Sequence, residues 1–371
     1  MSGDYRLQQL RAAMRARGVS RVVAVSSSYH NFLDLNPVLV CTGFKSMGDS
    51  ALIVNAEGGE NLIVSPYWDA FRARSRSGLQ DIAAVDDAVA YLLSKAVPAH
   101  VAGATALAGL RRLPTAQAGA IRKKFADAVD GDALLEAAGN SPDPSRLAAA
   151  RRAVEVAEEG YRQLLPLLVP GSRECDIAAR IYTEIKKLGA DDNFMLLTSA
   201  RHGRGITTAS RKLLEAGDTV VIEITPSIDG QFVQLPRTAY VGVPPRHLRR
   251  DAELLLQVFE HGLALCRPGA RVCDVARGMN EVLARAGYGD YCCPPYMRVR
   301  GHGMGNVSNA PGDVTVDNDS ELKEGDVFVL HPEQYLPESG YLLLGEPIAI
   351  TADGARVLTS RRCRLDAVEV A

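Results

Sequence analysis

The stretch from Gly217 to Gly242 reads GDTVVIEITPSIDGQFVQLPRTAYVG and predicts two strands joined by a tight turn. Residues 219–224 are β-branched apart from Glu223, and β-branched residues are enriched in strands. Asp229-Gly230 is a strong signal for a two-residue hairpin turn, and Pro236 suggests an edge or a bulge in the second strand. Because a buried carboxylate needs a partner or a task, Glu223 is expected to be either paired or functional.

The overall composition is that of a globular protein. The 371 residues allow two or three domains, and the 47% hydrophobic and 23% charged residues are ordinary values. A net charge of −2 gives no reason to expect nucleic acid or an anionic membrane as a partner. No apolar run has the length of a membrane span, and the first residues lack the apolar core of a signal peptide. Seven scattered cysteines without a Cys-x-x-Cys pair predict reduced thiols, so we expect a cytoplasmic protein.

Strands alternate with helices in the first part of the chain. An amphipathic helix is expected near residues 5–17, and short strands are expected over residues 21–26, 37–41, 50–54, 62–64 and 100–104. The turn-rich segment GNSPDPS at residues 139–145 is the best domain boundary. The sequence therefore predicts an α/β (α+β) protein with an α/β domain over residues 1–140 and a second domain over residues 145–371.

The second domain surrounds the hairpin with helices. These are expected over residues 145–169, 172–188, 249–266 and 272–286, with Ser172 as a plausible N-cap. A glycine-rich loop at residues 294–309 contains His302, and the strand at residues 327–330 leads into His331.

Several short motifs, in this order and spacing, resemble the creatinase, prolidase, aminopeptidase P and methionine aminopeptidase family. They are Val169-Pro-Gly-Ser-Arg-Glu174, Gly217-Asp218, Arg237-Thr238, Arg267-Pro268-Gly269, Gly301-His-Gly-Met-Gly305, Gly325-Asp-Val-Phe328 and Asp353-Gly354. The resemblance implies a pita-bread fold for the second domain. The segments Asn36-Pro37-Val38 and Thr42-Gly43-Phe44 look like the smaller creatinase-like N-terminal domain, and the family suggests a homodimer.

The peptidase members of this family hold two metal ions with two Asp, one His and two Glu. By resemblance, these five positions fall on Glu223, Gln234, His302, His331 and Gly345. Two adjacent dications need bridging carboxylates, whereas Gln234 is neutral and Gly345 has no side chain. The sequence therefore predicts that a dinuclear centre is not retained.

A second family histidine, which follows the Gly-His-Gly loop, falls on Asn309, so cleavage by the family mechanism is not expected either. Creatinase offers a metal-free precedent with a similar hairpin, but it has Glu and His where this chain has His331 and Gly345.

Glu223, His302 and His331 are expected to converge and to act as catalytic residues. A desolvated carboxyl group with two imidazoles suits proton transfer without a metal. The same three residues also have the composition of a mononuclear site for one iron, manganese or zinc ion. A third reading is an inert cluster in which the three side chains only bond to one another.

Further residues are candidates for substrate binding. Arg237 could bind a substrate carboxylate, although it could equally pair with Glu223 or Glu346. The other candidates are Gln234, Glu333, Glu346, Asn309, Tyr341 and His202.

The sequence thus favours a small-molecule hydrolase acting without a metal on a non-peptide C–N bond of a carboxylate-bearing compound. A mononuclear-metal enzyme and a non-catalytic binding module on the same scaffold stay open as alternatives.

Overall fold

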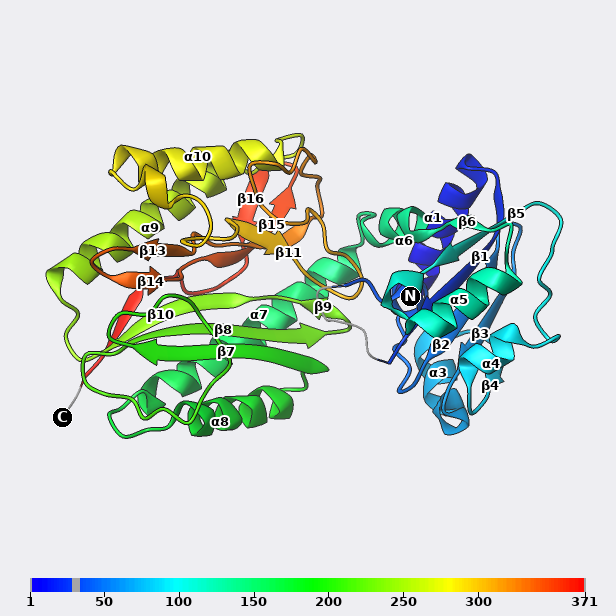
Figure 1. The fold of residues 1–371 in the computed structure, drawn as a ribbon, viewed down its shortest axis with the longest axis horizontal. Helices are drawn as coiled ribbons and strands as arrows, with labels where there is room; N and C mark the ends of the chain where they lie inside the picture. The colour runs from blue at the N-terminus through cyan, green and yellow to red at the C-terminus, as the bar shows by residue number, and fades with distance from the viewer. Residues whose placement is uncertain (1, 29–33, 370–371) are drawn as a thin grey trace. The chain divides into compact units, whose positions relative to one another are not determined.

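The structure is a computed structural model that describes residues 2–28 and 34–369. It divides into two compact units (Figure 1). The first unit comprises Met1–Asp143 and Gly305–Asn309, and the second comprises Pro144–Met304 and Ala310–Ala371. Within the described ranges, no helix combines the length and apolar character needed to cross a bilayer.

The first unit is an α/β layer structure built on a mixed sheet with strand order β4-β3-β2-β1-β5-β6. Its α-helices, 3₁₀ helices (η) and strands are α1 (Ser2–Ala16), β1 (Val19–Ser26), α2 (Pro37–Thr42), β2 (Ser50–Asn55), β3 (Glu60–Val64), η1 (Tyr67–Asp69), α3 (Ala70–Ser77), β4 (Ile82–Ala84), α4 (Ala88–Leu93), β5 (Ala104–Ala108), η2 (Leu110–Arg112), α5 (Thr115–Lys124), β6 (Val129–Asp130) and α6 (Asp132–Gly139). Apolar side chains on the two faces of the sheet belong to separate buried clusters, so helices cover both faces.

The prediction of a strand at residues 37–41 is wrong, because this segment forms helix α2. The Asn36 side chain accepts a hydrogen bond from the Leu39 N–H at 2.9 Å and caps the helix. Pro37 occupies the first turn, where its missing N–H costs nothing, and Gly43 ends the helix with φ 68°. A short buried apolar run shows no periodicity that distinguishes a helix from a strand. In this segment the capping residues decide for a helix. Strand β5 also begins at Ala104, where the predicted strand ends.

The second unit has two larger sheets between two pairs of helices, and a separate two-stranded sheet of β13 and β14. Its elements are α7 (Pro144–Leu164), η3 (Leu165–Leu167), α8 (Glu174–Lys187), β7 (Asp192–Ala200), β8 (Thr219–Ile228), β9 (Gln231–Phe232), β10 (Leu235–Val241), α9 (Arg246–Leu265), α10 (Val272–Arg285), η4 (Gly289–Tyr291), β11 (Gly301–Gly303), β12 (Val327–Leu330), β13 (Gln334–Leu336), β14 (Gly340–Leu342), β15 (Glu346–Thr351), β16 (Gly354–Val357) and β17 (Leu365–Val368). Figure 1 shows α7 and α8 along the sheet of β7, β8 and β10, and α9 and α10 beyond β11 and β15. The two sheets therefore face each other in the interior of this unit.

The predicted hairpin is confirmed as β8 and β10, with the short β9 between them. Asp229 and Gly230 have φ of 50° and 77°, which are the positive values that a type I′ turn requires. Pro236 pairs with Glu223 across the hairpin, while the pairing of β10 with β17 begins only at Thr238. At Pro236, strand β10 is thus paired with β8 on one side and has no partner strand on the other. The missing N–H of Pro236 therefore removes no hydrogen bond to β17.

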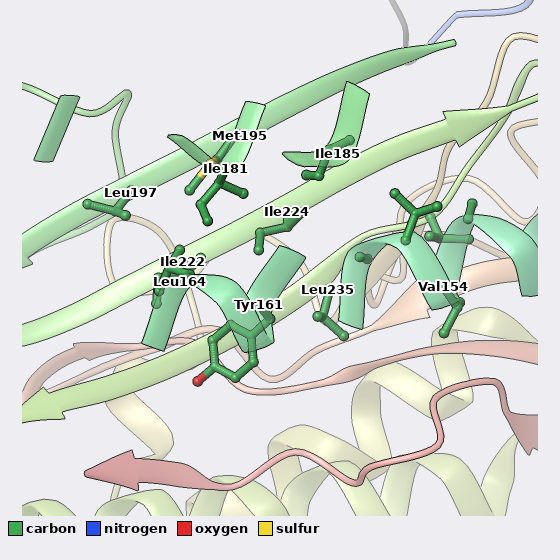
Figure 2. Close-up of a cluster of buried hydrophobic side chains, with 14 of the residues drawn as sticks. Val154, Tyr161, Leu164, Ile181, Ile185, Met195, Leu197, Ile222, Ile224 and Leu235 are labelled. Carbon is green, nitrogen blue, oxygen red and sulfur yellow. The ribbon is translucent and has the colours of Figure 1, made fainter. Parts of the chain in front are cut away.

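Alternation along β8 separates an apolar face from a polar one. Ile222 and Ile224 point toward α7 and α8 and pack in a large core that includes Tyr161 (Figure 2). Glu223 and Thr225 point the other way because successive side chains in a strand face opposite sides. The polar face of β8 is therefore turned toward the second sheet, from which the histidines come.

Candidate active site

Glu223 is the buried acid at the centre of the polar face. Its side chain accepts a hydrogen bond from Gln234, and only 7% of the residue is exposed. Burial and, second, the nearby carboxylate of Glu333 raise the pKa of Glu223 to about 7. A carboxyl group with this pKa exchanges its proton near neutral pH, as a general acid or base must.

His302 and His331 lie together on neighbouring strands. His302 is on β11, and His331 follows β12, with ring centroids 5.3 Å apart in an edge-to-face arrangement. Burial lowers the pKa of both imidazoles, to about 3 for His331, so both rings are neutral at pH 7. The His302 Nδ1 atom lies 3.3 Å from the Gly303 carbonyl oxygen, which favours the tautomer with its proton on Nδ1.

Neither ring nitrogen of His331 has a hydrogen-bond partner in the described part of the chain. One of the two carries a proton in a neutral ring, so His331 has both a donor and an acceptor to offer.

Glu333 and Tyr341 complete the group. The Glu333 carboxylate accepts hydrogen bonds from the Arg298 and Val299 N–H groups at 2.8 and 3.0 Å and from the Tyr341 hydroxyl at 2.8 Å. Burial opposes its ionisation, but the His331 ring and these donors outweigh it and lower the pKa of Glu333. Glu333 is therefore a fixed negative charge close to Glu223. We call the group of Glu223, Gln234, His302, His331, Glu333 and Tyr341 the central cluster.

Arg237 and Glu346 lie elsewhere and are occupied by each other. Arg237 Nη2 is 3.1 Å from a Glu346 carboxylate oxygen, and Nη1 donates to the Gly345 carbonyl at 2.7 Å. Glu346 also accepts hydrogen bonds from the Thr359 hydroxyl and the Cys363 N–H. Arg237 pairs in register with Ile222, so alternation turns it away from Glu223. The predicted roles of Arg237 and Glu346 in substrate binding have no support in this geometry.

Two other candidates are placed outside the central cluster. His202 is exposed, and its Nε2 lies 3.0 Å from the Pro337 carbonyl oxygen while its ring contacts Tyr335 edge-on. Asn309 belongs to the segment Gly305–Asn309 of the first unit. Their predicted contact with substrate stays a prediction.

The residues at the family's metal positions do not fit a dinuclear centre. Gln234 is a neutral amide, and a Cβ atom at Gly345 would lie 2.4 Å from the Leu330 carbonyl oxygen and 2.5 Å from the His331 Cβ atom. A carboxylate could not be accommodated at position 345 without moving the backbone. Throughout residues 2–28 and 34–369, no three His, Cys, Asp or Glu side chains form a group that could hold a metal ion.

Sequence reasoning missed two buried polar residues of the hairpin, Thr225 and Gln231. The Thr225 hydroxyl and the Gln231 Oε1 atom are buried and have no hydrogen-bond partner among the described residues. The signal for Thr225 was present, because Glu223, Thr225 and Ser227 alternate along β8 and mark one polar face.

Comparison with known proteins identifies relatives of this chain. A family model described as metallopeptidase family M24 matches residues 148–356, which are 209 of the 371 residues. An uncharacterized peptidase, YqhT, of Bacillus subtilis is 29% identical over 56% of this chain and 58% of its own length. The Xaa-Pro dipeptidase of Pyrococcus furiosus is 27% identical over 56% of this chain and 60% of its own length. The matched part thus spans less than two thirds of these relatives.

Solved structures share the fold over nearly the whole chain. An X-Pro aminopeptidase from Thermotoga maritima has a TM-score of 0.84 at 20% identity, and the match covers 98% of this chain and 99% of that one. The N-terminal domain of the FACT complex subunit SPT16 from chickpea matches with a TM-score of 0.72 at 13% identity, over 97% of this chain and 96% of that one. The predicted α/β pita-bread fold is confirmed.

The relatives also correct the predicted activity. Hydrolysis of a non-peptide C–N bond was inferred from the substituted metal ligands, but the relatives are named as peptidases and Xaa-Pro dipeptidases. That prediction is wrong. The ligand positions of a site describe its mechanism, and they carry no information about the rest of the bound molecule.

Proposed function

We propose, since the chain belongs to metallopeptidase family M24, that its central cluster hydrolyses the amide bond of a short peptide. The names of the relatives support the substrate class. The observation that carries the chemistry is a buried acid, Glu223, with a pKa of about 7, which shares the neighbouring carboxylate of Glu333 with a neutral imidazole, His331, whose two ring nitrogens have no partner among the described residues.

In this proposal Glu223 moves the proton. Its carboxylate form accepts a proton from a water molecule as that water attacks the peptide carbonyl carbon, and its acid form then gives the proton to the departing amine nitrogen. The hydrogen bond from Gln234 holds the carboxyl group in place. Water adds across the amide bond, and Glu223 ends as it began.

The remaining members of the central cluster polarise the peptide carbonyl group and position the side chains that act on it. His331 stays neutral, so its single ring N–H can donate to the carbonyl oxygen as negative charge develops there. Glu333 holds the Tyr341 hydroxyl at 2.8 Å and adds the negative charge that contributes to the raised pKa of Glu223. Tyr341 and Glu333 are therefore positioning residues.

We propose that this reaction needs no dinuclear centre. The argument rests on the donor set, because Gln234 is neutral and position 345 has no room for a carboxylate side chain. No step above depends on a metal ion.

The test is peptide hydrolysis by the full chain, with Xaa-Pro dipeptides assayed by chromatography of the released amino acids. We expect hydrolysis that persists after exhaustive treatment with a chelator and falls at least ~100-fold in Glu223→Gln. The control Glu253→Gln changes an exposed acid on α9 and should leave the rate unchanged.

Three outcomes would overturn the proposal. They are a rate unaffected by Glu223→Gln, peptide binding by the folded protein without any turnover, and activity that is lost with the chelator and restored by one equivalent of iron, manganese or zinc. The last two would favour the binding module and the mononuclear site respectively.

The homodimer and the cytoplasmic location are also proposals. The dimer rests on the family resemblance, and sedimentation velocity would test it. All seven cysteines are free of disulfides, which is compatible with a reducing compartment.

A further inference from the structure

The first unit carries a group of exposed apolar side chains. Tyr67 and Trp68 of η1 are 58% and 63% exposed, and Phe71 of α3 is 83% exposed. Met47, in the loop before β2, is 63% exposed. A single exposed apolar side chain is ordinary, but a group of them on one surface marks an interaction site. We call Met47, Tyr67, Trp68 and Phe71 the aromatic patch.

The buried Asp69 holds the parts of this surface together. Its carboxylate accepts hydrogen bonds from the Met47 N–H at 3.0 Å and from the Arg72 guanidinium group at 2.7 and 2.8 Å. The same guanidinium group donates to the Lys45 carbonyl oxygen at 2.9 Å. The loop at residues 45–47 therefore lies against η1 and α3, and Met47 adjoins the aromatic residues.

Helix α3 turns one face to the core and another to solvent. Ala73 is fully buried, whereas Trp68, Phe71 and Arg74 follow one another at a spacing of three residues and are all exposed. The rings of Trp68 and Tyr67 meet edge-on, with their centroids 5.5 Å apart. Helix α3 packs beside β4, which is the edge strand of the sheet (Figure 1). The aromatic patch therefore lies at the edge of the first unit.

Basic side chains border the aromatic patch. Lys45 and Arg74 are exposed, and Arg74 forms no ion pair within the part of the chain that the structure describes. Arg72 is 44% exposed at its side chain and neutralises Asp69. The net charge of −2 is an average over the whole chain, and it does not describe this surface, whose border is positive.

Aromatic side chains bordered by basic ones match the surface of an anionic bilayer. Trp and Tyr rings favour the region between the lipid headgroups and the acyl chains, and Lys and Arg are attracted by anionic headgroups. A second copy that presented the same surface would bring Lys45 and Arg74 close to their own equivalents. Like charges oppose such a contact, so the charge favours the bilayer.

We propose that the aromatic patch inserts into the interface of a bilayer that contains anionic lipid, while Lys45 and Arg74 contact the headgroups. The contact is peripheral, since the inserted side chains come from one short helix, η1 and a loop. It goes beyond the proposed peptide hydrolysis, because the patch belongs to the first unit and the central cluster to the second.

The fluorescence of the full-length protein tests this contact directly, because Trp68 is the only tryptophan of the chain. Vesicles of phosphatidylcholine with about one third phosphatidylglycerol should shift its emission to shorter wavelength, and lipids with brominated chains should quench it. Vesicles of phosphatidylcholine alone should bind at least ~10-fold more weakly, and added salt should weaken binding to the anionic vesicles.

Two variants separate the apolar contribution from the charged one. Phe71→Ser should weaken co-sedimentation with anionic vesicles at least ~10-fold, whereas Arg74→Gln should mainly reduce the preference for anionic lipid. The matched controls are Val243→Ser, at an 81% exposed site in the second unit, and Arg151→Gln, at an exposed site on α7. Both controls should bind vesicles like the wild type. Circular dichroism checks that the variants fold, and quenching of the wild type needs no variant.

The inference fails if anionic vesicles leave the Trp68 emission unchanged, or if Phe71→Ser binds them like the wild type. It also fails if binding depends on charge alone and brominated chains do not quench Trp68. An oligomer in sedimentation velocity that Phe71→Ser disrupts would likewise overturn it, because a second copy would then cover the aromatic patch.

Discussion

Replacing Glu223 by glutamine should change how the stability of the protein depends on pH. Burial and the neighbouring Glu333 raise the pKa of Glu223 from 4.5 to about 7. The folded state therefore favours the protonated acid, and this contribution to stability is fully present below pH 4.5. It is lost as the pH rises through 7, because ionisation then costs more in the folded state than in the unfolded one. A difference of 7 − 4.5 = 2.5 pKa units, at about 1.4 kcal/mol per unit, amounts to roughly 3 to 4 kcal/mol.

Glutamine cannot ionise, so Glu223→Gln should lack this loss. Urea unfolding of the wild type and the variant, followed by circular dichroism at several pH values from 4.5 to 8, isolates the effect because other titrating groups cancel in the difference. We expect the stability of the variant relative to the wild type to rise by about 2–3 kcal/mol across this range. Glu253→Gln should give a difference that does not change with pH. A constant difference for Glu223→Gln would show that Glu223 ionises normally and would refute the assignment of this acid as the proton carrier.

Three further substitutions test the packing and buried charges of the second unit. Gly345→Ala should lower stability by about 1–3 kcal/mol because the new Cβ atom would lie 2.5 Å from that of His331; an unchanged urea midpoint would contradict this crowding. Arg237→Met should cost about 3–5 kcal/mol in thermal unfolding because Glu346 would stay buried without its partner, and the double variant Arg237→Met, Glu346→Gln should recover part of the loss. Glu174 accepts four hydrogen bonds from two serines, which lower its pKa against the effect of burial. Glu174→Gln should therefore lower the free energy of unfolding at pH 7, and its difference from the wild type should become smaller as the pH falls below 4. A difference in unfolding free energy that does not change with pH would argue against an ionised Glu174.

Long, strongly patterned segments could be predicted from the sequence. The hairpin turn at Asp229-Gly230 has the backbone angles that its residues imply, and helix α10 begins at Val272 as expected. The segment at residues 37–41 could not be assigned, because five apolar residues that are buried on all sides have no period. In helix α8 the expected cap at Ser172 is absent: the helix begins at Glu174, whose carboxylate accepts hydrogen bonds from Ser199 of β7 and from Ser210.

Predicting the site required the sequence and the resemblance together. Strand alternation places Glu223 on the polar face, and the ring centroids of His302 and His331 lie 5.3 Å apart. The predicted convergence of Glu223 with both histidines stays a prediction. The partner of Arg237 could not be predicted, because an arginine on this strand can pair with an acid on either face of the sheet. Only the register that pairs Arg237 with Ile222 decides which face its side chain takes. Thr225 and Gln231 were overlooked because a residue that lacks a partner becomes visible only when its surroundings are known.

The close contact between Gly345 and its neighbours also limits how this protein can change. A side chain at position 345 would strike both the Leu330 carbonyl oxygen and the His331 Cα and Cβ atoms. Gly345→Glu alone would therefore lower stability before it could supply a ligand. Shortening His331 alone would leave the backbone carbonyl in the way. A carboxylate at position 345 would therefore require accompanying changes in the strand end at Leu330 and His331. Directed evolution toward a metal-dependent variant would have to begin by reshaping the segment from Leu330 to His331.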